Sequence, residues 1–202
     1  MQLYVFPPSP NAMKVMSLAN YLKADVEFVN VDLTKGEQQS ESFLALNPNG
    51  KMPVLVDGDF VLWESNAILQ YLADSAGSDL YPDSPQARAD IARWLFWQTA
   101  HLGPAIGKVF FEILIRQGMM GEQPDAAAVE AGMNEFRQHA ACLERQLDGR
   151  AFVTGELSVA DFAIGAWLTY ADATALPLSE FPRISTWYHD HVAALPGWQS
   201  AA

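Results

Sequence analysis

The chain has 202 residues, of which 50% are hydrophobic and 18% are charged, as in an ordinary globular protein with room for a sizeable core. Its formal net charge of −12 argues against binding to nucleic acid or to anionic membrane surfaces, because both attract cationic proteins. No apolar run approaches the ~20 residues of a membrane helix, and the N-terminus does not resemble a signal peptide. The single cysteine, Cys142, excludes an internal disulfide and is typical of a reducing, cytoplasmic environment.

Over residues 1–78, apolar runs and turn signals predict alternating strands and helices. The expected elements are strands at 3–6 and 26–31, a helix around 15–22, a polar loop at 34–40 and a short helix around 43–46. The order strand, helix, strand is typical of a βαβ unit.

The stretch 47–65 holds the densest set of local signals. Asn47-Pro48-Asn49-Gly50 predicts a turn, and Asp57-Gly58 predicts a hairpin between strands at 54–56 and 60–63. Pro53 cannot donate to a sheet, so it lies at an edge, at the first strand residue, or in a special backbone shape such as a cis bond. That shape would leave the N–H and C=O of Met52 free to form hydrogen bonds with another group. Glu64-Ser65 then opens a helix that ends near residue 77.

After residue 78 the pattern becomes helical. The polar, proline-rich segment 79–85 predicts a linker between one domain at 1–78 and a second at 86–202. Helical stripes are expected over 91–113, 129–147 and 182–192, and Gly103-Pro104 should kink or split the first of them.

A capping box is predicted at Ser158, because Asp161 three residues later can accept a hydrogen bond from the Ser158 N–H. Leu157 and Phe162 occupy the matching hydrophobic-staple positions. Asp161 is therefore expected to be structural, and its loss should cost about 1 kcal/mol or more. Cys142 lies beside an apolar stripe and is expected to be a buried structural thiol.

Four motifs in this order resemble the glutathione transferase family over nearly the whole chain: Ser9-Pro10-Asn11, Asn47-Pro48 through Met52-Pro53, Glu64-Ser65, and the Ser158–Asp161 box. The likeness is closest to serine-type members of the theta, delta and bacterial kind. It implies an α/β thioredoxin-like N-terminal domain, an all-α C-terminal domain, a glutathione site on the first, and an electrophile pocket between the two. It also implies a homodimer and a cis Met52-Pro53 bond.

By this resemblance, Ser9 is the catalytic serine, which donates a hydrogen bond to the glutathione sulfur. A hydrogen bond of about 1.5–3 kcal/mol to the thiolate would lower a thiol pKa near 8.5 by roughly one to two units. Asn11 departs from the pattern of many serine-type members, and its amide could assist or replace Ser9. The alternative for both residues is simple capping of the following helix.

The resemblance also implies the glutathione contacts. The backbone of Met52, next to Pro53, would pair with the cysteinyl residue as an added strand. Glu64 and Ser65 would hold the γ-glutamyl end, although they could also be an ordinary helix start. Lys51 and Gln38 are candidates for the glycyl end.

The electrophile pocket is expected to use residues from one long helical segment, Trp97, His101, Lys108 and Phe111, although an aromatic stripe is more often core. No metal is expected. The predicted activity is conjugation of glutathione to a small hydrophobic electrophile. A glutathione-dependent disulfide reductase or peroxidase, and a non-catalytic glutathione-binding scaffold, remain open alternatives.

Overall fold

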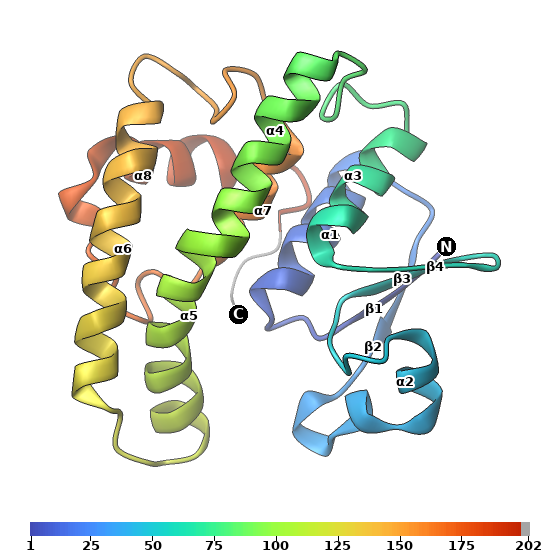
Figure 1. Ribbon diagram of the computed structural model, residues 1–202, viewed down its shortest axis with the longest axis horizontal. Coiled ribbons are helices and arrows are strands. Elements are labelled where there is room, and N and C mark those ends of the chain that lie inside the picture. Colours follow the sequence, from blue (N-terminus) through green and yellow to red (C-terminus); the bar gives the residue numbers. More distant parts are fainter. Residues whose placement is uncertain (199–202) are drawn as a thin grey trace.

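The computed structural model describes residues 1–198 and shows a small sheet on one side of the molecule and a helical half on the other (Figure 1). The sheet has the strand order β2–β1–β3–β4. Its strands are β1 (Gln2–Val5), β2 (Glu27–Asn30), β3 (Val54–Asp57) and β4 (Phe60–Trp63). β1 pairs in parallel with β2, whereas β3 runs antiparallel to both β1 and β4. All four predicted strands are confirmed, with ends shifted by at most one residue.

Alternation along β1 divides the first half into two layers. Leu3 and Val5 join the main core, which includes α1 (Pro10–Leu22) and α3 (Ser65–Ser75). Tyr4 packs in a small second cluster with Phe43 of α2 (Glu41–Leu46). The polar segment at 34–40 is not a plain loop, because it contains parts of two 3₁₀ turns, Leu33–Lys35 and Glu37–Gln39.

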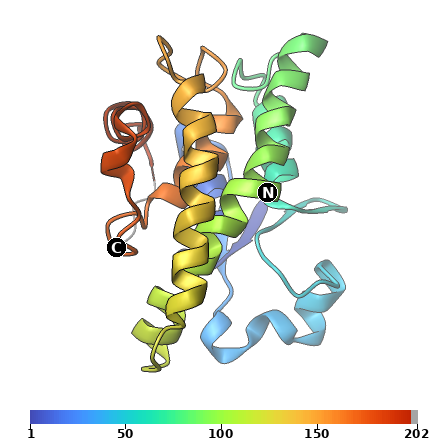
Figure 2. The same cartoon turned by 60° about the vertical axis from the view of Figure 1, so that its left-hand side comes forward.

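The helical half consists mainly of three long helical segments and a shorter C-terminal one. Its elements are α4 (Pro85–Trp97), a π-helical turn (Gln98–Leu102), α5 (Gly103–Phe110), a π-helical segment (Phe111–Met119), α6 (Ala126–Gln146), α7 (Val159–Leu168), a 3₁₀ turn (Leu178–Glu180), and α8 (Pro182–Thr186) continued by a π-helical segment (Trp187–Val192). Figures 1 and 2 both show α6 beside the α4–α5 run. No helix within residues 1–198 is long and apolar enough to cross a membrane.

The disruption predicted at Gly103-Pro104 takes the form of a π-helical turn and not a break. Gly103 keeps helical dihedral angles, φ −59° and ψ −49°. The turn Gln98–Leu102 immediately precedes it, and such wide turns accommodate a missing backbone donor within a helix.

α7 joins the two halves. All of its side chains except that of Trp167 are buried, and the helix packs against α1, α3 and α4. One continuous hydrophobic cluster therefore runs through both halves. The predicted capping box at its start is confirmed: Asp161, fully buried, accepts hydrogen bonds from the Ser158 N–H, the Val153 N–H and Trp187 Nε1. Burial raises the pKa of Asp161 to about 6, although these hydrogen bonds oppose the shift. Cys142, in contrast to the expectation, is only partly buried.

Candidate functional site

Ser9 lies at the N-terminus of α1, where the backbone is held but the side chain is not. Its N–H donates to the Phe6 carbonyl at 2.8 Å, and Pro10 is the first helical residue. The hydroxyl of Ser9 makes no capping hydrogen bond, so the simple capping role is not what the structure shows. The preceding Pro8 carbonyl accepts a 2.8 Å hydrogen bond from Tyr170 of the helical half. The Ser9 turn is therefore fixed from both halves, with its hydroxyl at a positive helix end.

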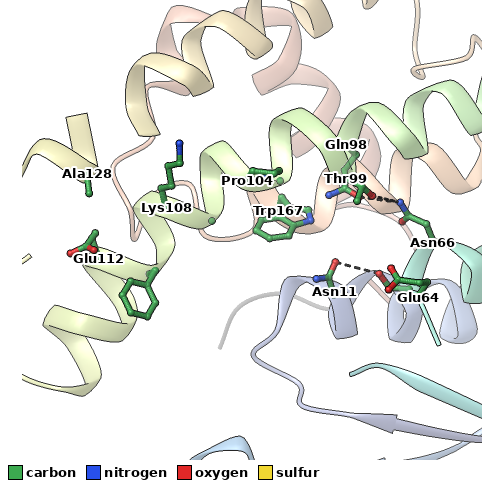
Figure 3. Close-up of a pocket in the computed structure, with 14 residues that line it drawn as sticks. Asn11, Glu64, Asn66, Gln98, Thr99, Pro104, Lys108, Glu112, Ala128 and Trp167 are labelled. Carbon is green, nitrogen blue, oxygen red and sulfur yellow. Dashed lines mark hydrogen bonds between the residues drawn. The ribbon is translucent and has the colours of Figure 1, made fainter. Parts of the chain in front are cut away.

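Asn11 and Ser65 connect the first turns of α1 and α3. Ser65 Oγ donates to Asn11 Oδ1 at 3.3 Å, and both residues line one cavity (Figure 3). Because Asn11 accepts through its oxygen, its NH₂ group is the donor that remains for a ligand.

Glu64 precedes α3 with φ +73° and ψ 107°, a conformation that costs a non-glycine residue roughly 1–3 kcal/mol. Its side chain is exposed and lines the same cavity as Asn11. The strained backbone therefore presents a carboxylate beside the N–H groups at the start of α3.

The loop before β3 is held by a buried side chain. Asn47 is 2% exposed; its Nδ2 donates to the Lys51 carbonyl at 2.6 Å and its Oδ1 accepts from the Asn49 N–H at 3.0 Å. The Met52-Pro53 bond is cis, as predicted. Neither the N–H nor the C=O of Met52 forms a hydrogen bond within the described part of the chain. Lys51 is exposed.

Gln38 lies on the turn Glu37–Gln39, which packs against this loop at Gly50. A Cβ on Gly50 would lie 3.3 Å from the Gln38 carbonyl, which shows how closely the two segments approach. Gln38 Oε1 is buried without a partner among the described residues. Gln38, Lys51 and Met52 thus belong to neighbouring loops, apart from the residues that line the cavity at Asn11.

The cavity itself has a volume of about 580 Å³ and lies between the two halves. Asn11, Glu64, Ser65 and Asn66 form one wall, and residues of the α4–α5 run and α7 form the other. Trp167 is its largest apolar element (Figure 3). Added Cβ atoms on Gly103 and Gly107 would lie 3.5 and 3.6 Å from the Trp167 ring, which is ordinary contact distance, so the ring lies directly against this part of the α4–α5 run.

Of the four predicted electrophile residues, the structure brings only Lys108 and Phe111 to this cavity. Trp97 and His101 face α6 instead, with ring centroids 6.4 and 5.2 Å from that of His139. The spacing of these residues would place all four on one face of a regular α-helix. The π-helical turn Gln98–Leu102 breaks that register, because each extra residue rotates the following side chains by about 100°. Lys108 also pairs with Glu135 at 2.5 Å.

Sequence reasoning missed a polar cluster behind the cavity wall. Lys14 of α1 is only 1% exposed, and its Nζ donates to Asn66 Oδ1 at 2.6 Å and Gln98 Oε1 at 3.4 Å. Asn66 Nδ2 in turn donates to Thr99 Oγ1 at 2.9 Å. Burial lowers the pKa of Lys14 to about 7, and the charge of Glu64 partly opposes this shift. The available signal was that α1 carries no other charged side chain.

Comparison with known proteins agrees with this architecture. The model of the glutathione S-transferase N-terminal domain matches residues 1–74, and that of the C-terminal domain matches residues 126–190. Glutathione S-transferase 3 of Zea mays is 36% identical and glutathione S-transferase D6 of Drosophila melanogaster 34% identical; each match covers 98% of this chain, and 91% and 90% of the relative.

A relative with a different described activity also matches. The disulfide-bond oxidoreductase YfcG of Escherichia coli is 30% identical over 95% of this chain and 89% of its own. Among solved structures, a glutathione S-transferase from Pseudomonas fluorescens superimposes with a TM-score of 0.88 at 33% identity, over 98% of this chain and 96% of its own. Another family member from that organism, solved with two glutathione molecules bound, has a TM-score of 0.84 at 28% identity, over 98% and 92% of the two chains. The chain belongs to the glutathione S-transferase family.

Proposed function

We propose that the chain is a glutathione transferase that conjugates the glutathione thiolate to a small hydrophobic electrophile. The observation that carries the proposal is the cavity between the halves. It joins Asn11, Glu64 and Ser65 on one wall to Phe111 and Trp167 on the other. A peptide ligand on the first wall would thus face an apolar co-substrate on the second.

Ser9 is the catalytic residue in this proposal. Its hydroxyl donates to the glutathione sulfur, and the N-terminus of α1 adds favourable electrostatics for the thiolate. The thiolate is the nucleophile, so stabilising it near neutral pH increases the reactive fraction. The Asn11 NH₂ group is a second donor at the same turn.

The remaining glutathione contacts follow from the loops and from α3. The Met52 N–H and C=O pair with the cysteinyl backbone beside Pro53. Glu64 binds the α-ammonium, while the Ser65 hydroxyl and the first N–H groups of α3 bind the carboxylate of the γ-glutamyl end. Lys51 and Gln38 serve the glycyl carboxylate, Lys51 through its ammonium and Gln38 through its side-chain NH₂ group.

On the electrophile side, Phe111 and Trp167 supply apolar surface and Lys108 a positive charge that favours anionic leaving groups. Trp97 and His101 have no part in the proposal, because they face α6.

The chain has two domains, forms a homodimer and is located in the cytoplasm in this proposal. Residues 1–78 form the glutathione-binding domain and residues 86–202 the helical domain, joined by 79–85. The assembly is a homodimer, supported by exposed apolar side chains on β4 and α4, of which Phe96 is 75% exposed and Phe60 47%. The location is cytoplasmic, in keeping with a single cysteine.

The test is Ser9→Ala, assayed with an aryl chloride and by ultraviolet titration of the bound thiol. We expect kcat to fall roughly 10- to 100-fold and the thiol pKa in the complex to rise by roughly one to two units. Ser42→Ala, which changes an exposed serine on α2, is the matched control and should change neither quantity. Wild-type turnover and an unchanged thiol pKa in Ser9→Ala would show that Ser9 does not stabilise the thiolate.

A second activity is favoured by the similarity to the oxidoreductase. The turn at the start of α1 has no cysteine. Reduction of a mixed disulfide would therefore use two glutathiones, one free and one already joined to the substrate. The thiolate of the free glutathione attacks the glutathione sulfur of the mixed disulfide, which gives oxidised glutathione and releases the substrate thiol. Parallel assays of a mixed disulfide and an aryl chloride separate the two activities. Calorimetry that shows no binding at millimolar glutathione would exclude both activities and leave only a non-catalytic role that does not involve glutathione.

A further inference from the structure

The buried Lys14 has no carboxylate partner. Its ammonium donates to two neutral amide oxygens, Asn66 Oδ1 and Gln98 Oε1, and no described residue forms a salt bridge with it. Burying a cation without a counter-ion is unfavourable. A buried cation that is retained beside a ligand cavity is placed where it can interact with a bound ligand.

Both acceptors of Lys14, Asn66 and Gln98, line the cavity and are labelled in Figure 3. Lys14 therefore lies directly behind the cavity wall. An ammonium only donates, so each amide must turn its oxygen toward Lys14. The NH₂ group of Asn66 is consequently directed to the Leu95 carbonyl at 3.0 Å and to Thr99 Oγ1. Lys14 therefore fixes the first turn of α3, which carries Ser65 and Asn66, against the α4–α5 run.

The same end of the cavity has an electrostatic conflict. Glu64 would hold the ligand's ammonium, yet its own charge repels the carboxylate that Ser65 and the start of α3 would bind. Among the described residues, Glu64 is the ionisable group whose charge acts appreciably on Lys14. A positive charge behind Asn66 offsets that repulsion through the low-dielectric wall.

We propose, on the basis of the glutathione site described above, that Lys14 is a positioning residue whose buried charge allows Glu64 and the γ-glutamyl carboxylate to share one end of the cavity. Lys14 takes up a proton from solvent when this end is filled. The free protein has a pool of neutral Lys14 to draw on, because burial lowers its pKa to about 7. A bound carboxylate then favours the ammonium form.

Other charged groups on the elements around Lys14 have partners of their own. On α3, Tyr71 bonds to Asp57 and Asp74 pairs with Arg88 of α4. On α7, Asp161 is engaged by its capping contacts. The rest of the α4–α5 run contributes the Arg93–Asp90 pair, the Lys108–Glu135 pair and His101, whose ring lies against His139. Lys14 and Glu64 are thus the two groups whose electrostatic interaction changes when a ligand fills the cavity.

The experiment is calorimetric titration of the full-length protein with S-methylglutathione, whose blocked sulfur cannot release a proton. Titrations at pH 7.5 in phosphate and in Tris, which differ in ionisation enthalpy, measure the protons taken up. The wild-type protein should take up a fraction of one proton. Lys14→Met should take up none and bind roughly 5- to 20-fold more weakly. Lys14→Arg should bind within about threefold of wild type and take up none, because arginine stays charged.

Lys23→Asn is the matched control, because it removes a charge from the exposed left-handed end of α1, where asparagine is tolerated; it should behave as wild type. Wild-type affinity in Lys14→Met, or no proton uptake by the wild-type protein, would overturn the inference. If the Lys14 variants do not fold, the proton uptake of the wild-type protein alone decides the outcome. Absence of S-methylglutathione binding to the wild-type protein would refute the glutathione site itself, and the Lys14 inference with it.

Discussion

Replacing Asp161 with alanine should destabilise the protein more than any surface change. The carboxylate accepts from the Val153 N–H and the Ser158 N–H at 2.9 Å each and from Trp187 Nε1 at 3.0 Å, all in a fully buried site. Removing it leaves three buried donors without a partner, at about 1 kcal/mol or more each. We therefore expect the free energy of unfolding to fall by about 3–5 kcal/mol.

Urea denaturation at pH 7.5, followed by tryptophan fluorescence, measures this loss. With an m-value of about 2 kcal/mol/M, the midpoint should fall by about 1.5–2.5 M. Asp190→Ala, at an exposed acid in the same half, is the control and should change stability by less than about 0.5 kcal/mol. A loss below about 1 kcal/mol in Asp161→Ala would refute the assignment of these contacts as the anchor of α7.

The other predictions concern pH, packing and charge. The folded-state pKa of Asp161, about 6, is above its ordinary 3.8, so between these values the folded state binds more protons and its stability falls as pH rises. Asp161→Asn should therefore lack a decrease of about 2 kcal/mol that the wild type shows in urea titrations from pH 4 to 6. Gly132→Ala should cost about 1–3 kcal/mol, because its Cβ would lie 2.7 Å from Val109 Cγ2; equal thermal stability would contradict the close α5–α6 packing. Gly107→Ala meets only ordinary contacts and should stabilise α5 by about 0.5–1 kcal/mol by the same measurement. Lys108→Met should slow conjugation of electrophiles that release an anionic leaving group more than conjugation of electrophiles that release none, while its half-exposed pair with Glu135 contributes less than about 1 kcal/mol to stability.

Features set by a few adjacent residues were predictable from the sequence. The hairpin and the capping box at Ser158 each depend on residues within a single turn, and both are confirmed, although the hairpin turn is Gly58-Asp59 and not the predicted Asp57-Gly58, because Asp57 pairs with Phe60. The cis bond before Pro53 was predicted by family resemblance and is also present.

The parts of the site that depend on tertiary context were not predictable in the same way. Trp97 and His101 are expected at the cavity because the family resemblance places the electrophile pocket along this helical segment, and a π-helical turn changes which residues of the segment face the cavity. Lys14 is the one charged residue of α1, but this signal alone does not predict burial, because a lysine in a helix is ordinarily solvated and its burial comes from α3 and the α4–α5 run. The exposure of Cys142 likewise depends on how α6 packs against α4, and the apolar pattern of α6 itself does not specify that packing.

The hydroxyl of Tyr170, which holds the Pro8 carbonyl, has a consequence for recombining this chain with its relatives. A chimaera that joins residues 1–78 to a foreign helical half would inherit Ser9 but not this anchor or the α7 surface that packs on α1. Crossovers at 79–85 would therefore conserve Asn11, Glu64 and Ser65 on the cavity wall and still change how the Ser9 turn is held. Grafting Tyr170 together with α7 is the smallest exchange that keeps the turn and its support from the same parent.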